Sequence, residues 1–398
     1  MNTEQLAVKG FRFAGCASGI KKSGKLDLAL IYSDRPATCA GVFTRNKVVA
    51  APVLVTRPII SDGCCQAILV NSGNANACTG EAGLADARRC VELTAQALEI
   101  GPGLVAVSST GVIGVPLPMS LFEEAVPGLP DRLDPSGAGQ VAEAIMTTDS
   151  FSKTSVREVD LSGKKVRVLG IAKGAGMIHP DMATMLAFVV TDADVEQTFL
   201  QHTLKRCVDR SFNSITVDGD TSTNDMVLVL ANGTAGAEQI NDDAPCASQF
   251  EAALQDVLLD LAKMIVRDGE GATKLVEICV RGARNDQEAR TAARAVATSS
   301  LVKTAFFGED ANWGRIIAAI GYSGAEVQEE LATLSFEDAV VYRHGLTTGP
   351  EAEERASEIL KQPEFKVVVD LGLGNGEASY FTSDLSYDYV RINADYRT

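Results

Sequence analysis

The spacing of apolar residues changes several times along this chain. Short apolar segments bounded by Gly, Pro, Asn and Asp predict strands within residues 27–70, in LDLALIY, AAPVLVT and QAILV. Residues 80–100 carry apolar side chains at helical spacing and predict a helix. LVAVSSTGVIGVPLP then returns to a strand that ends in a glycine loop, and residues 130–140 predict a surface connection.

The second half of the chain also mixes the two patterns. KKVRVLGIAKG predicts a strand that enters a loop, and TMLAFVVTDADV predicts a strand that leaves it. Residues 250–268, residues 285–307 and a segment that starts near Pro350 predict helices. The end, residues 365–398, predicts paired strands around a glycine-rich turn. Because no regular βαβ alternation is present, we expect the α+β class, with sheets covered by helices.

Composition limits the function classes. The 398 residues are 46% hydrophobic, enough for a large core and two or three subdomains. The formal charge of −16 disfavours binding to nucleic acid or anionic membranes. Nine scattered cysteines without a C-x-x-C pair indicate reduced thiols. No apolar run approaches a membrane span, so we expect a cytoplasmic protein.

Cofactor and metal motifs are weak. The three histidines, His179, His202 and His344, share no H-x-x-x-H spacing, so we expect neither a metal site nor a bound cofactor. LGLGNG is not followed by a helix, which disfavours a dinucleotide site, and DGDTSTND has its glycine at the wrong position for a calcium loop.

A glycine-rich loop that meets an apolar strand, GAGMIHPDMATML, contains the candidate nucleophile Thr184. Thr184 alone fits a β-branched strand residue equally well. A hydroxyl nucleophile requires a neighbouring base. If the bond between Ala183 and Thr184 is cut, the new α-amine of Thr184, with a pKa of about 7.7–8.0, supplies that base.

Two further motifs carry candidate chemistry. In SSTGVIG, Thr110 and Gly111 provide a hydroxyl and a backbone N–H that suit an oxyanion, although a plain strand-to-turn glycine explains the same letters. In DGEGATK, Glu270 lies in a glycine-flanked loop, where a solvated carboxylate is the simpler interpretation.

Together these segments resemble one family, the ornithine acetyltransferase (glutamate N-acetyltransferase, ArgJ) family of arginine biosynthesis. The resemblance covers nearly the whole chain in order. Its blocks are GIKKSGKLDLALIYSDRPATCAGVFTRNKVVAAPV, NSGNANACTG, SSTGVIG, AIMTTDS, AKGAGMIHPDMATMLAF, FNSITVDGDTSTND, DGEGATK, FFGEDANWGRI and RINADYRT. Ser150 stands where members commonly have threonine, and the hydroxyl is kept.

The resemblance implies self-cleavage between Ala183 and Thr184, which gives an α chain of 1–183 and a β chain of 184–398. It also implies a layered α/β/β/α fold and an assembly of two α and two β chains. By motif position it assigns Thr184 as nucleophile, Thr110 and Gly111 to oxyanion stabilisation, and Thr147, Lys173, Thr184, Glu270, Asn393 and Thr398 to substrate contacts.

The implied reaction is ping-pong: Thr184 takes acetyl from N2-acetylornithine and passes it to glutamate. Some members of the family also use acetyl-CoA as a co-substrate, and the quoted residues leave both kinds open. Two other readings stay open as well. One is an N-terminal-nucleophile aminopeptidase or amidase on a similar scaffold, and the other is a non-catalytic binding protein that keeps the scaffold.

Overall fold

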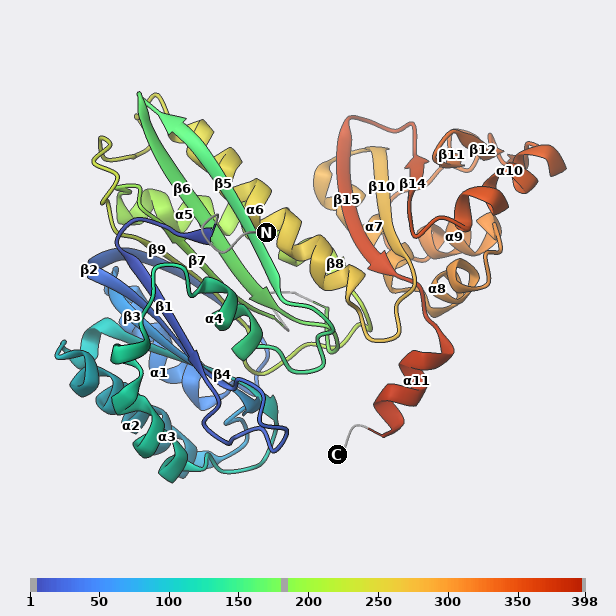
Figure 1. The fold of residues 1–398 in the computed structure, drawn as a ribbon. Coiled ribbons are helices and arrows are strands. Elements are labelled where there is room, and N and C mark those ends of the chain that lie inside the picture. The colour runs from blue at the N-terminus through green and yellow to red at the C-terminus, as the bar shows by residue number, and fades with distance from the viewer. Residues whose placement is uncertain (1–5, 180–184, 396–398) are drawn as a thin grey trace. The chain divides into compact units, whose positions relative to one another are not determined.

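The computed structural model describes residues 6–179 and 185–395, which form two compact units (Figure 1). Unit 1 comprises the described residues up to 174, with 185–213 and 220–262. Unit 2 comprises 175–179, 214–219 and the described chain from 263 onward. Each unit has its own sheet and is described by itself. The units differ from the segments 1–183 and 184–398, which would result from a cut in the chain and do not mark a fold boundary.

Eight strands form the sheet of unit 1, in the order β4-β3-β2-β9-β7-β6-β5, with β1 paired to β2. Most of these strands are the ones that the apolar segments predict, including LDLALIY, QAILV and the pair around the glycine loop. Their bounds are β1 Phe11–Cys16, β2 Leu28–Phe43, β3 Cys64–Asn74, β4 Val105–Val112, β5 Lys153–Leu161, β6 Lys164–Lys173, β7 Leu186–Thr191 and β9 Met226–Ala231.

Strand β2 joins the two parts of this sheet. Its first residues pair with β3 and its last with β9, and the register with β3 is irregular between Tyr32 and Ala37. Leu28 and Leu30 belong to the apolar cluster that includes helix α2 (Gly80–Leu98), whereas the alternate residues of the strand belong to the cluster that includes α4 (Ala138–Ala144). Both faces of the first part of β2 are therefore buried, which explains its apolar run LALIY, whereas Asp34, Arg35 and Pro36 in the middle of the strand are exposed.

Helix α1 (Ala51–Ser61) occupies the segment AAPVLVT, so the strand predicted there is wrong. Pro52 lies in the first turn, where a helix does not need its N–H. The hydroxyl of Thr56 donates to the carbonyl of Val107 at 2.7 Å and accepts from its N–H at 2.8 Å, which fixes α1 on β4. Tertiary packing therefore outweighs the β-branched composition of this segment.

The other helices of unit 1 include α2, as predicted over 80–100, and α6, as predicted over 250–268. Their bounds are α3 Met119–Ala125, α5 Gln197–Asp209 and α6 Ala247–Arg267, whose last residues belong to unit 2. Helix α6 approaches β6 closely at Gly170, where a Cβ would lie 2.5 Å from Val257. Residues 130–140 contain a short 3-10 helix, Pro130–Arg132, and the start of α4.

The ends of three strands meet at one edge of the unit 1 sheet. Lys173, the last residue of β6, pairs with Leu186, the first residue of β7. Leu186 in turn pairs with Met226, the first residue of β9. All residues of β7 and β9 are buried, so this edge is a rigid part of the sheet. The glycine loop of the sequence connects β6 to β7 at this edge.

Unit 2 has a seven-stranded sheet in the order β13-β12-β11-β14-β10-β15-β8. β14 and β15 flank the glycine-rich turn near the end of the chain, but they do not pair with each other, because β10 lies between them. The predicted pairing was therefore wrong. The bounds are β8 Ile215–Thr216, β10 Leu275–Ala283, β11 Thr333–Phe336, β12 Ala339–Arg343, β13 Leu346–Thr347, β14 Glu364–Asp370 and β15 Gly376–Ser383.

Helices cover one face of this sheet, and α7 packs on β10 and β15 (Figure 1). Residues 285–307 form two helices instead of one, because Ser299 is extended and its hydroxyl caps the second helix at Val302. A helix, α11, follows β15 where only strands were predicted. The bounds are α7 Asp286–Thr298, α8 Ser300–Phe307, α9 Trp313–Gly321, α10 Pro350–Leu360 and α11 Tyr387–Ala394.

The α+β class is confirmed, with two sheets that are each flanked by helices. Helix α10 begins at Pro350, as predicted. Of the helices in residues 6–179 and 185–395, none combines the length and apolar character needed to cross a bilayer.

A buried lysine, Lys303 of α8, contacts the end of β15. Its Nζ donates to the hydroxyl of Thr382 at 3.0 Å, and to the hydroxyl and carbonyl oxygens of Ser383. Burial lowers the pKa of Lys303 to about 7, against the opposing influence of Asp384 and Asp218. The folded chain therefore releases this proton more readily than the unfolded chain, where lysine has a pKa near 10.4.

We predict that Lys303 makes stability rise with pH. Between pH 7 and about 10 the unfolded state holds more protons at this group, so the free energy of unfolding increases by up to about 1.4 kcal/mol per pH unit. Thermal unfolding at pH 7.0 and 8.5 should show a higher Tm at pH 8.5, and this rise should shrink in Lys303→Met. An equal rise in the variant would assign the effect to other groups.

Candidate active site

Thr110 lies near the end of β4 and is 9% exposed. The neighbouring Ser109 donates its hydroxyl to the Asn71 side chain of β3 at 2.6 Å. Asn224, which precedes β9 in the chain, donates to the carbonyl of Ser109 at 2.9 Å and to that of Ala75 at 2.6 Å. Side chains from two other segments therefore fix Ser109, the residue immediately before Thr110: Asn71 through its hydroxyl and Asn224 through its carbonyl.

Gly111 follows Thr110 at the closest approach of β3 and β4. It has φ +134°, and a Cβ would lie 2.3 Å from the carbonyl carbon of Gly73. Any other residue would force the two strands apart. The structure thus gives Gly111 a steric reason for being glycine. Its assignment as an N–H donor to an oxyanion stays a prediction.

Lys173, the last residue of β6, contacts Thr110 of β4. The distance from Lys173 Nζ to Thr110 Oγ1 is 3.2 Å, and Lys173 is 7% exposed. Four strands separate β4 from β6 in the sheet order, which in a flat sheet would place them roughly 24 Å apart. Because a lysine side chain cannot span that distance, the sheet must curve so that these strand ends approach each other. Two residues 63 positions apart in the chain are brought together in this way.

The direction of this hydrogen bond determines what the hydroxyl can do. An ammonium group only donates, so Thr110 Oγ1 is the acceptor and its own hydrogen is directed elsewhere. Thr110 therefore remains a donor toward any oxygen placed beside it. A donor polarised by an adjacent cation in a site that excludes water is suited to a developing oxyanion.

Asp149 is a buried carboxylate next to this pair that the sequence analysis did not single out. Its Oδ1 accepts from Lys153 Nζ at 2.7 Å and from the Gly174 N–H at 2.6 Å, and its Oδ2 accepts from the Thr147 N–H at 2.9 Å. Burial by itself would raise the pKa of Asp149. The charges of Lys173 and Lys153, with the hydrogen bonds from Lys153 and Thr147, outweigh it and lower the pKa to about 2.

Thr147, an expected substrate contact, is half-buried and is fixed through its backbone by Asp149. Thr110, Gly111, Thr147 and Lys173 all belong to unit 1, and we call them the unit 1 group. Lys173 contacts Thr110 directly. Asp149 binds the N–H groups of Thr147 and of Gly174, the residue after Lys173, and so links Thr147 to the same place. The sequence signal for Asp149 was its place in the quoted block AIMTTDS.

Ala183, Thr184 and Thr398 lie outside the described residues. Only Met185 separates Thr184 in the sequence from Leu186, which pairs with Lys173. Met185 is buried, and its carbonyl accepts from the N–H of Met226. The strand that follows the expected nucleophile therefore begins opposite the lysine that contacts Thr110.

Glu270 and Asn393, the two other expected contacts, meet in unit 2. Asn393 Nδ2 donates to Glu270 Oε2 at 2.9 Å and to the carbonyl of Tyr389 at 3.0 Å. Glu270 is only 9% exposed, so the simpler interpretation of a solvated carboxylate is wrong. Gly176 packs directly on it, because a Cβ there would lie 2.4 Å from the carboxyl carbon of Glu270.

The chain upstream of the expected cut is fixed within unit 2. Asp218 accepts from the N–H of Met177 at 2.6 Å and from the N–H of Ile178 at 2.8 Å. The carbonyl of Ile178 accepts from the N–H of Val217 at 2.7 Å. Met177 has φ +56°, a left-handed conformation that is unfavourable for a side chain of this type. Asp218 therefore holds a strained turn in place.

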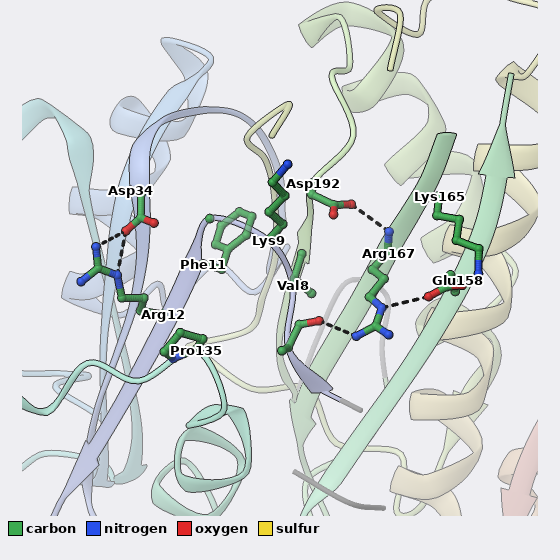
Figure 2. A pocket seen from close by; sticks show the side chains of 12 residues that line it. Val8, Lys9, Phe11, Arg12, Asp34, Pro135, Glu158, Lys165, Arg167 and Asp192 are labelled. Carbon is green, nitrogen blue, oxygen red and sulfur yellow. Dashed lines mark hydrogen bonds and ion pairs between the residues drawn. The ribbon is translucent and has the colours of Figure 1, made fainter. Parts of the chain in front are cut away.

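A surface hollow of about 440 Å³ lies elsewhere in unit 1 (Figure 2). Its charged side chains largely pair with one another: Arg12 with Asp34, and Arg167 with Glu158. Arg167 precedes Lys173 by six residues in the same strand, which corresponds to roughly 20 Å. The hollow therefore does not contain the expected site residues, and the unit 1 group remains the better candidate.

Comparison with known proteins decides the family. A model described as the ArgJ family matches residues 12–398. The chain belongs to the ArgJ family. The resemblance read from the sequence blocks is thus confirmed, and it covers nearly the whole chain.

ArgJ proteins of known sequence align with the chain from end to end. The arginine biosynthesis bifunctional protein ArgJ of Syntrophotalea carbinolica is 61% identical, over 98% of this chain and 99% of its own length. The same-named protein of Geobacter sulfurreducens is 55% identical, over 98% of this chain and 100% of its own length. The chain is therefore an enzyme of the ArgJ type, which acts in arginine biosynthesis.

A solved ArgJ structure supports the fold as well. The crystal structure of the arginine biosynthesis bifunctional protein ArgJ from Bacillus halodurans has 51% sequence identity and a TM-score of 0.52. The match covers 53% of this chain and 99% of that chain. The solved chain is thus about half as long as the chain described here, whereas the ArgJ sequences above match this chain over nearly its full length.

Proposed function

We propose that this ArgJ enzyme transfers an acetyl group from N2-acetylornithine to glutamate through an ester on Thr184. The observation that carries the proposal is the contact between Lys173 and Thr110 at the edge where β7 begins. It supplies an oriented hydroxyl donor beside the strand that follows Thr184 in the sequence. Membership of the ArgJ family supplies the reaction class.

The nucleophile requires a base, and self-cleavage provides one. In our proposal the Thr184 hydroxyl attacks the Ala183 carbonyl carbon, the C–N bond breaks, and the resulting ester is hydrolysed by water. The products are a carboxylate at Ala183 and a free α-amine at Thr184, which then accepts the hydroxyl proton. The half-length chain of the solved ArgJ relative supports this step, since a cut at this position leaves just over half of the chain on the C-terminal side.

Acetyl transfer would then follow in two half-reactions. Thr184 attacks the acetyl carbonyl of N2-acetylornithine and releases ornithine with the proton. The amine of glutamate attacks the acetyl-threonine ester and gives N-acetylglutamate. Both steps pass through a tetrahedral oxyanion, which we assign to the Thr110 hydroxyl and the Gly111 N–H. No cofactor takes part in this scheme.

Two charged residues have the signs that such substrates require. We assign Lys173 to a substrate carboxylate or to the hydroxyl that it already polarises, and Glu270, held by Asn393, to a substrate ammonium. Thr147 and Thr398 complete the proposed contacts by family position. Ornithine derivatives and glutamate carry both charge types.

We also propose a cytoplasmic enzyme of two α and two β chains, which accepts acetyl-CoA as a second donor. The nine cysteines are all free thiols, which suits a reducing compartment. The relatives are named bifunctional, which supports the second donor. Glutamate acetylation with acetyl-CoA as sole donor measures that activity directly.

An N-terminal-nucleophile aminopeptidase or amidase is the alternative from another reaction class. It would share the cut and the oxyanion donors but would pass the acyl group to water. Release of ornithine from N2-acetylornithine, measured with and without glutamate, separates the two reactions. Transfer requires N-acetylglutamate to appear in step with ornithine, whereas hydrolysis gives free acetate.

We predict that Thr184→Ala leaves the chain intact and inactive, because both cleavage and transfer need the hydroxyl. Thr184→Ser, which keeps it, should still be cut. Intact mass of the purified proteins measures the outcome: wild type should give two polypeptides, one of which begins at Thr184. A cut Thr184→Ala chain would place the nucleophile at another residue.

We predict that Thr110→Val lowers kcat by about 100- to 1000-fold, since it removes one oxyanion donor without changing side-chain volume much. Thr110→Ser is the matched control and should stay within a few-fold of wild type. Rates are compared per cleaved enzyme, so that slower cleavage is not counted as slower transfer. A wild-type rate in Thr110→Val would remove this hydroxyl from the oxyanion site.

We predict that Glu270→Gln raises KM for N2-acetylornithine by roughly 10-fold, because it removes a charge and keeps an acceptor for Asn393. The KM for glutamate and the Tm of the variant are measured as controls. Glu364, an exposed glutamate of unit 2 that pairs with Arg267, offers the matched substitution Glu364→Gln, which should leave both constants unchanged. Equal effects of the two variants would contradict a substrate contact at Glu270.

A further inference from the structure

Asp149 is a buried charged residue of unit 1 that the proposed reaction does not use. Its side chain and that of Lys153 are both 0% exposed. Lys153 also lies over the Phe151 ring at 4.8 Å and donates to the Phe151 carbonyl at 3.3 Å. Carboxylates are seldom buried so fully unless they are paired and hydrogen-bonded. Lys153 supplies the pairing, so its presence alone would explain a stable core.

The remaining contacts of Asp149 point toward the expected site. The carboxylate accepts the N–H of Gly174, the residue after Lys173, and the N–H of Thr147. Lys173 itself is close enough to influence the ionisation of Asp149. One side chain thus fixes the backbone at Gly174, directly after the lysine that contacts Thr110, and at Thr147.

The fixed backbone determines where the Lys173 ammonium lies. Lys173 ends β6, and Gly174 turns out of the sheet with φ +152°. The hydrogen bond from the Gly174 N–H to Asp149 fixes the chain directly after Lys173.

We propose that Asp149 is a positioning residue for acetyl transfer, which holds Lys173 so that its ammonium orients the Thr110 hydroxyl toward the oxyanion. This inference rests on the proposed function. Asp149 does not touch the reacting atoms in this scheme; it acts through Lys173 and Gly174. Because the oriented hydroxyl serves the tetrahedral intermediate, the effect falls mainly on kcat and less on KM.

A purely structural role is the competing explanation, and Lys153 allows it to be tested. Asp149→Asn removes the charge and leaves Lys153 buried without its counter-ion, which destabilises any fold. In Asp149→Asn with Lys153→Gln, the amide of residue 149 can donate to that of residue 153, and the amide of residue 153 can donate to the Phe151 carbonyl. The double variant therefore removes both buried charges together.

The experiment measures Tm, kcat and KM for acetyl transfer in the wild type, Lys153→Gln, Asp149→Asn and the double variant. We expect Lys153→Gln to keep kcat within about threefold, because Asp149 still holds Gly174 and Lys173. We expect Asp149→Asn to lose Tm and at least 10-fold in kcat. The double variant should regain part of the lost Tm, keep the low kcat, and show KM within about threefold of wild type.

Recovery of kcat together with Tm in the double variant would overturn the proposal, as would a wild-type kcat in Asp149→Asn. If Asp149→Asn does not fold, the double variant alone decides between the two roles. A wild-type protein that is uncut or that transfers no acetyl would instead contradict the proposed function, so the two failures give different results.

Discussion

The hydrogen bond from Lys173 to Thr110 is the interaction on which the proposed chemistry of unit 1 depends. A threonine hydroxyl can donate or accept, and in water it alternates between the two. An ammonium cannot accept, so its neighbour is left with a hydrogen to give. Since both residues are less than 10% exposed, few water molecules compete for that hydrogen, and the electrostatic effect is stronger than at a surface. A common residue thereby becomes a directed donor.

Three features of unit 1 accompany this contact. The sheet must curve, because β4 and β6 are not neighbours. Gly111 must lack a side chain, because the β3 backbone lies against it. A buried lysine also needs a nearby negative charge, which Asp149 provides. The curvature of the sheet, Gly111 and Asp149 each have a separate physical cause, and all three affect the surroundings of Thr110.

The sequence predicted the local parts of this site but not its assembly. Thr110, Gly111 and Lys173 were identified from short blocks, since a strand that runs into glycines has a recognisable pattern. The contact between Lys173 and Thr110 was not predicted, because the curvature of an eight-stranded sheet leaves no local pattern in the sequence. Asp149 was missed because an aspartate after two threonines also fits a turn, and its burial depends on Lys153 and Gly174.

The segment of helix α1 was predicted as a strand for a similar reason. Its helical conformation depends on the contact of Thr56 with β4, which the local sequence does not show. Helix α11 was missed because eight residues are too few for a helical period to stand out.

The described residues on each side of the expected cut have contacts of their own. On the upstream side, Asp218 fixes Met177 and Ile178, with Met177 in an unfavourable left-handed conformation. On the downstream side, Leu186 is a fully paired strand residue of the unit 1 sheet. Upstream of the expected cut, a single carboxylate thus stabilises a backbone conformation that a methionine adopts only at a cost. Downstream, strand pairing begins at the second residue after Thr184, so the chain enters the sheet almost directly after the expected nucleophile.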